Sequence, residues 1–106
     1  MSLPLFIDDS LRLAFRTRPA GPWPAVEGHV RPATPAEARS FLARLNALKP
    51  DDAAGEVRVR SEFYATHIKA WSAGPAVTPE LVAALPAPVF DQLADVCTGY
   101  GDLLGN

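Results

Sequence analysis

The 106-residue sequence has few of the residues that build disulfides and metal sites, since it contains one cysteine and two histidines. Cys97 has no second cysteine with which to form an internal disulfide, and His29 and His67 are too scattered to complete a metal cluster with it. We therefore expect no metal and no other cofactor. The missing disulfide suits a reducing cytoplasm.

Long apolar runs and a basic N-terminal segment are also missing. No run approaches the roughly 18 apolar residues of a membrane span. Asp8 and Asp9 stand where a signal peptide would carry basic residues. We expect a protein that remains in the cytoplasm and has no membrane partner.

Positive charge is absent from the last part of the chain. The formal net charge of −2 gives little general attraction to nucleic acid, which is therefore an unlikely partner. All ten Lys and Arg residues lie at or before Lys69, whereas residues 78–106 carry acids and no basic residue. These acids are Glu80, Asp91, Asp95 and Asp102. The acidic end either faces solvent, which is the commoner case, or meets a basic partner.

An apolar content of 48% is enough for one modest core, and 106 residues fit a single domain. We predict an α+β fold in which a short N-terminal β-hairpin or small antiparallel sheet precedes a compact bundle of roughly three to four helices. The predicted parts are a β-rich and Pro-rich start at 1–32, a helical part at 33–100 and a tail at 101–106.

Two short apolar segments at the start predict strands. Residues 11–16 alternate, with large apolar side chains at every second position and Arg or Ala between them. Residues 3–7 form a second extended segment, which Pro4 confines to an edge, and the polar residues 8–10 favour a tight turn. The simplest product is a hairpin of 3–7 with 11–16.

A loop and a weaker strand follow. Residues 17–25 contain three prolines and a glycine, which exclude a helix or a central strand. Trp23 lies between two prolines, where it either covers the domain surface as a lid or contacts a partner. Residues 25–31 predict a third short strand, weakened by Gly28.

A helix start is the sharpest local signal. Thr34 is suited to the N-cap, Pro35 to the first helical position, and Glu37 to closing a capping box. Pro50 is expected to end this helix. Its apolar stripe consists of Ala38, Phe41, Leu42, Leu45 and Leu48.

The segment 56–72 is the densest in apolar and aromatic residues, and we predict that it is the central helix. Its first five residues alternate like a strand, so a start near Ser61 is the alternative. Residues 73–75, Ala-Gly-Pro, should end it. The apolar side consists of Val57, Phe63, Tyr64, His67, Ile68 and Trp71.

Two further helices are predicted. Thr78 and Pro79 repeat the helix-start signal, and Pro86 closes that short helix. The last helix reaches about Thr98 and ends at Gly99. Its apolar side consists of Val89, Phe90, Leu93, Val96, Cys97 and Tyr100.

The sequence shows no recognisable catalytic constellation, so we predict no catalytic residue and no enzyme. Cys97 lies in an apolar stripe, where a thiol usually acts as a small hydrophobe, and His67 is expected to be a partly buried structural residue. The neighbouring acids in turns are expected to shape those turns. A local positive patch is an alternative feature, formed by Arg12, Arg16, Arg18, Arg58 and Arg60.

Three segments follow one another in a recognisable order. They are Arg31-Pro32-Ala33-Thr34-Pro35-Ala36-Glu37, then Ile68-Lys69-Ala70-Trp71, then Val77-Thr78-Pro79-Glu80-Leu81 through Leu85-Pro86. In order and spacing, about residues 25–98 resemble the small tail assembly chaperones of long-tailed bacteriophages and prophages. The Pro-rich loop around Trp23 departs from the family pattern, as does Ser72 at a position where that family often has an acid.

The resemblance implies a non-enzymatic protein that binds the tape measure protein and helps recruit tail tube subunits in the cytoplasm of the bacterial host. Self-association is a further open possibility. Candidate partner contacts are Trp71, Tyr100, Leu103, Leu104 and Trp23, with a core position the favoured alternative for Trp71. The competing hypotheses are a small regulatory or nucleic-acid-associated domain of a bacterial protein that uses the arginines, and a small enzyme with the Trp23 loop as its lid.

Overall fold

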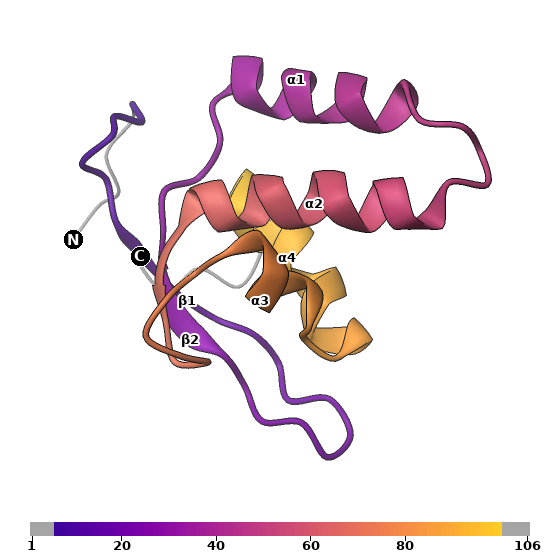
Figure 1. The fold of residues 1–106 in the computed structure, drawn as a ribbon. Helices are drawn as coiled ribbons and strands as arrows, with labels where there is room; N and C mark the ends of the chain where they lie inside the picture. Colours follow the sequence, from indigo (N-terminus) through magenta and orange to yellow (C-terminus); the bar gives the residue numbers. More distant parts are fainter. Residues whose placement is uncertain (1–5, 101–106) are drawn as a thin grey trace.

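The computed structural model describes residues 6–100, which form a three-stranded antiparallel sheet and four helices (Figure 1). The predicted α+β class is confirmed. Along the chain the elements are β1 (Leu13–Arg16), β2 (Glu27–Val30), α1 (Pro35–Asn46), α2 (Ala53–His67), β3 (Ile68–Trp71), α3 (Pro79–Ala83) and α4 (Ala87–Thr98). The predicted tail at 101–106 lies outside the described residues.

Of the predicted hairpin of 3–7 with 11–16, residues 3–5 lie outside the described residues, and residues 6–10 form no strand. Strand β1 pairs with β2, with Leu13 opposite Val30 and Arg16 opposite Glu27. The predicted turn does form, since the backbone N–H of Ser10 donates to Asp8 Oδ1 at 2.8 Å. It leads away from the sheet, however, because Phe6 is 81% exposed and residues 6–10 contain no strand.

The weak third strand is β2, the central strand of the sheet. Gly28 lies between Phe15 and Trp71 on the neighbouring strands. A Cβ atom added to Gly28 would lie 2.0 Å from the carbonyl oxygen of Ala70, so only glycine fits this close approach of two strands. The glycine that weakened the sequence pattern is therefore a requirement of the sheet.

The helix start at Thr34 is confirmed in detail. Thr34 Oγ1 accepts the N–H of Glu37 at 3.3 Å, and Glu37 Oε1 accepts the N–H of Thr34 at 2.9 Å, which is a complete capping box. The helix ends at Asn46, before Pro50. The second predicted start is also present, since Thr78 caps α3 through the N–H of Leu81.

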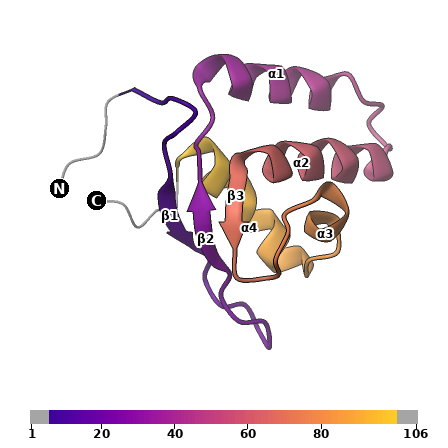
Figure 2. The same cartoon turned by 60° about the vertical axis from the view of Figure 1, so that its left-hand side comes forward.

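The central segment differs from its prediction at both ends. Helix α2 begins at Ala53, because Asp52 caps it by accepting the N–H of Gly55 at 2.8 Å. It ends at His67, and the next four residues form β3 at the edge of the sheet (Figure 2). The prediction of one helix through Trp71 is therefore wrong, whereas the alternating residues near Glu56 are helical, as predicted.

An irregularity in β3 explains why residues 68–71 were predicted as helix. The register between β2 and β3 shifts between His29 and Val30, and Lys69 has no partner in the ladder. This irregularity lets Ile68 and Trp71 both face the core, at the same spacing of three residues that a helix would give. In this segment the spacing of the apolar residues is therefore the same in the strand as it would be in a helix.

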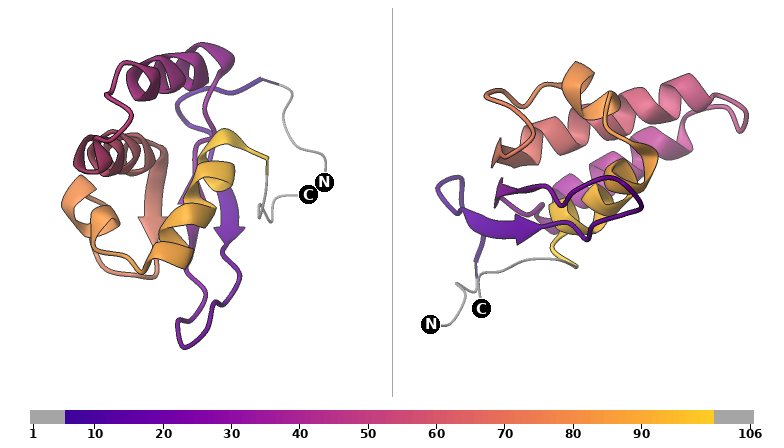
Figure 3. Two further views of the ribbon diagram at one scale, coloured as in Figure 1. Left: turned by 90° about the vertical axis from the view of Figure 1, so that its right-hand side faces the viewer. Right: turned by 90° about the horizontal axis from the view of Figure 1, so that it is seen from below.

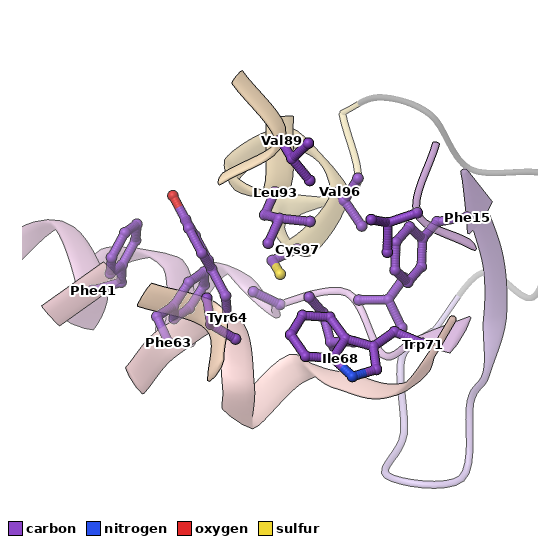
Figure 4. Packing of buried hydrophobic residues seen from close by; sticks show 14 of the residues in the cluster. Phe15, Phe41, Phe63, Tyr64, Ile68, Trp71, Val89, Leu93, Val96 and Cys97 are labelled. Atoms are coloured by element: carbon purple, nitrogen blue, oxygen red, sulfur yellow. The ribbon is translucent and has the colours of Figure 1, made fainter. Parts of the chain in front are cut away.

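The core lies between the sheet and the helices. Helix α1 runs beside α2, with the rings of Phe41 and Phe63 stacked at 4.0 Å between centroids. Helix α4 crosses one face of the sheet (Figure 3), and Leu93 is completely buried. Figure 4 shows Val89, Leu93, Val96 and Cys97 projecting from α4 into the core. Gly99, with φ of 86°, ends α4 as predicted.

Candidate functional site

The Pro-rich loop between β1 and β2 is an ordered extension of their hairpin, and we call residues 17–26 the arm. At its base the N–H of Thr17 donates to the carbonyl of Val26 at 2.9 Å. At its tip Ala20 and Trp23 exchange backbone hydrogen bonds of 3.1 and 3.0 Å. Gly21, with φ of 57°, makes the tight turn between them. The arm projects beyond the sheet in Figures 1 and 2.

Gln92 of α4 fixes the arm to the helical part. Its Oε1 accepts the N–H of Arg18 at 2.7 Å, and its Nε2 donates to the carbonyl of Arg18 at 3.0 Å. Thr17 Oγ1 accepts the N–H of Val26 at 2.8 Å in a buried position. Backbone groups that a proline-rich loop would leave open are thus satisfied by two side chains.

Trp23 lines an apolar cavity of about 300 Å³, which we call the Trp23 pocket. The indole is 46% exposed, so it both borders the cavity and presents a ring to solvent. The arm, the end of β3 and the turn between α3 and α4 enclose the pocket. Its lining residues are Trp23, Pro24, Ala25, Val26, Ser72, Ala73, Leu85, Pro86 and Val89.

The lining of the Trp23 pocket offers little for chemistry. Besides the indole, Ser72 is its one polar side chain, and Ser72 Oγ already accepts the N–H of Glu27 at 3.0 Å. Binding pockets that orient a small substrate place several polar groups around it. The Trp23 pocket is better suited to an apolar side chain of another protein.

The other predicted contact residues do not gather at this pocket. Trp71 belongs to the core, since it is 9% exposed and its indole N–H donates to the carbonyl of Ala76 at 2.8 Å. Tyr100 is 89% exposed and follows α4, whereas the pocket borders the beginning of α4 at Val89. Leu103 and Leu104 lie outside the described residues.

The residues considered for catalysis are buried and separate from the pocket. Burial raises the pKa of the Cys97 thiol well above its usual range. The Nδ1 atom of His67 lies 2.9 Å from the carbonyl oxygen of Arg31, and burial lowers the pKa of this histidine. Among residues 6–100, no group of three His, Cys, Asp or Glu side chains is placed to hold a metal ion.

An ion pair between a buried cation and a partly exposed carboxylate stabilises the junction between β2 and α1. Arg31 is 6% exposed, and its Nη2 atom donates to Glu37 Oε2 at 2.5 Å. The hydrogen bond from Arg31 lowers the pKa of Glu37 to about 2, despite an opposing effect of burial. The same glutamate closes the capping box of α1, so one carboxylate neutralises a buried cation and begins a helix.

The five arginines of the predicted positive patch are divided between two regions. Arg16 forms an ion pair with Glu27 on the sheet, and Arg60 forms one with Glu56 on α2 at 3.0 Å. Arg12 donates to backbone carbonyls of its own segment. The α2 arginines lie about 10 Å or more along the helix from the end that joins the sheet.

The sequence prediction named Trp23 but missed the residues that complete its site. Leu85, Pro86 and Val89 were assigned to a short helix, a break and a core stripe. No signal in the sequence connects Gln92 with Arg18, because long-range hydrogen bonds leave no local pattern.

No family model, curated protein or solved structure matches this chain. Among the described residues, no helix combines the length and the apolar character needed to span a membrane.

Proposed function

We propose that this chain is a non-enzymatic tail assembly chaperone of a bacteriophage or prophage. In this role it binds the tape measure protein and helps recruit tail tube subunits in the cytoplasm of the bacterial host. The observation that carries the proposal is the order and spacing of three segments over about residues 25–98, which resembles that family.

Each of these segments corresponds to a defined part of the fold. The segment 31–37 contains the Arg31–Glu37 ion pair between β2 and α1. The segment 68–71 is β3, and the segment 77–86 contains the cap of α3 and the turn into α4.

The geometry of the exposed surface supports action through protein contact. Trp23 is held half-exposed on an arm that Gln92 attaches to α4, beside an apolar cavity of about 300 Å³. Rigid aromatic residues beside apolar pockets are typical anchors of protein interfaces. Because Gln92 and Thr17 already order the arm, a partner would meet a surface that costs little entropy to organise.

The second candidate, a regulatory or nucleic-acid-associated domain, has less support. Arg16 and Arg60 already pair with carboxylates, which reduces the positive charge available to phosphates. Titration with duplex and single-stranded DNA at low salt tests this candidate. Salt-sensitive binding would favour it over the chaperone.

Two experiments test the chaperone proposal. The genes beside this one should encode a tail tube protein upstream and a long tape measure protein downstream, and metabolic neighbours would contradict the proposal. Co-expression should also keep that tape measure protein soluble and co-purify it with this chain. A tape measure protein that is equally insoluble with and without the chain would reject the chaperone role.

A further inference from the structure

A second surface, separate from the Trp23 pocket, lies over the N-terminal half of α2. Val57 is 41% exposed there and lines two cavities. The cavity between α2 and α4 measures about 500 Å³, and the cavity between α2 and α3 about 410 Å³. Val57 lies between the two cavities and borders both, and we call this pair of neighbouring cavities the Val57 groove.

Small apolar side chains from all three helices form part of the lining of the Val57 groove, beside its charged residues. Ala53 and Ala54 flank Val57 on α2, Ala83 contributes from α3 and Ala87 from α4. Small side chains let a further helix approach closely. Phe90 and Tyr64 also line the cavity beside α4, with their ring centroids 5.3 Å apart.

The charges around the Val57 groove are unequal. On α2, Glu56 pairs with Arg60 at 3.0 Å, and Glu62 pairs with Arg44 of α1 at 2.5 Å. These pairs leave little net charge on the floor.

The walls, by contrast, carry acids. Glu80 of α3 and Asp91 of α4 line opposite cavities, and Arg58 lies on the side of Glu80. Helices α3 and α4 contain no Lys or Arg. In the cavity beside α4, Asp91 is therefore the charged lining residue that lies outside the Glu56–Arg60 pair.

We propose that the Val57 groove binds a cationic amphipathic helix of a partner protein. The apolar stripe of the partner helix covers Val57 and Phe90, and a Lys or Arg beside that stripe pairs with Asp91. This inference adds to the proposed function a binding surface and the chemistry of the partner. It depends on the proposed function in one respect, namely that the domain acts by binding another protein.

A helix is the occupant that this geometry favours. Three helices border the groove through side chains, which matches recognition of a helix in a groove, whereas an added strand needs the free backbone of a sheet edge. The acids of α3 and α4 also attract a basic helix over a distance, which raises its rate of association.

Fluorescence anisotropy with a labelled model peptide tests the proposal. The probe is an amphipathic peptide of about 18 residues made of Leu and Lys, which is long enough for about five helical turns. Its counterpart carries Glu in place of Lys. At about 0.15 M salt, where exposed charges act over about 8 Å, the Lys peptide should bind saturably and the Glu peptide at least about tenfold more weakly.

Two charge reversals on α4 form a matched pair. Asp91 and Asp95 are both exposed, but Asp95 lies one turn further along and lines neither cavity. Asp91→Lys should weaken binding of the Lys peptide about tenfold or more, and Asp95→Lys no more than about threefold. Val57→Asp should weaken it as strongly as Asp91→Lys. Circular dichroism checks that each variant folds.

The results distinguish the groove from general attraction. Equal losses in Asp91→Lys and Asp95→Lys, or no saturable binding of the Lys peptide, would overturn the proposal. Loss of peptide binding in Trp23→Ala would also overturn it, since Trp23 lines neither cavity. Failure of the tape measure co-purification with peptide binding intact would reject the chaperone role and leave the groove supported.

Discussion

Arg31 and Glu37 form an ion pair of 2.5 Å that joins the end of β2 to the first turn of α1. Glu37→Gln should destabilise the domain by about 1–3 kcal/mol, because it removes the closer of the two carboxylates beside the buried guanidinium, the other being Asp9 at 3.9 Å. The expected loss of stability is smaller than for a fully buried ion pair, since the Glu37 side chain is 39% exposed. Urea unfolding measures the change.

Glu62→Gln is the control for that variant. Glu62 pairs with Arg44 at the same distance of 2.5 Å, but both side chains are about half-exposed. Its loss should change the free energy of unfolding by less than about 1 kcal/mol. Equal effects of the two substitutions would show that burial of Arg31 does not matter.

Stability should fall in two stages as the pH is lowered. Burial lowers the pKa of His67 below 6.5, so its contribution is complete above about 6.5, the unfolded value, and decreases below it. The pKa of Glu37 is lowered from 4.5 to about 2, so its contribution is complete above 4.5 and is lost as the pH falls toward 2. Urea unfolding between about pH 8 and pH 2.5 should show both stages. Hydrogen bonds from Ser10 also lower the pKa of Asp8, which contributes to the lower stage. Glu37→Gln should therefore make the lower stage smaller, and a lower stage of unchanged size in this variant would contradict the assignment.

Ser61→Ala should stabilise the domain by about 1 kcal/mol. Ser61 is 2% exposed, and its Oγ atom has no hydrogen-bond partner among the described residues. Removing an unsatisfied buried hydroxyl from a helix eliminates its desolvation cost and improves helix propensity.

Ser72→Ala is the matched substitution of opposite sign. Ser72 Oγ accepts the N–H of Glu27 at 3.0 Å, so its removal should destabilise the domain by about 0.5–1 kcal/mol. Thermal unfolding of both variants gives the comparison. The interpretation fails if Ser61→Ala is the more destabilising of the two.

Gln92→Leu should release the arm without unfolding the core. The N–H of Arg18 loses its acceptor, so its hydrogen exchange should become faster and the emission of Trp23 should shift as its surroundings change. Gln92→Glu keeps an acceptor for that N–H and loses the bond from Nε2 to the Arg18 carbonyl, so its exchange should be intermediate. Unchanged exchange in Gln92→Leu would mean that the arm is held by other contacts.

Local signals in the sequence predicted local structure well. The capping box at Thr34 and Glu37, the second cap at Thr78 and the glycine after α4 all act within a few residues, and each is present. The alternation of residues 11–16 also predicted β1.

Long-range relationships were the part that the sequence could not supply. The strand partner of β1 is β2, beyond an arm whose prolines indicated a break, and the arm is ordered by Gln92 from the last helix. The change from helix to strand after His67 was hidden because a shifted register gives Ile68 and Trp71 the spacing of a helix. Of the candidate site, Trp23 was predicted, and the cavity beside it depends on packing that no local pattern encodes.

The central proposal is that this domain acts by binding a tape measure protein, and isothermal titration of the two purified proteins tests it most directly. The account predicts saturable binding that Trp23→Ala weakens about tenfold and that Phe6→Ala, another exposed aromatic residue, leaves within about twofold. Absence of binding by the wild-type chain would contradict the central proposal, and equal losses in the two variants would contradict the role of the Trp23 pocket.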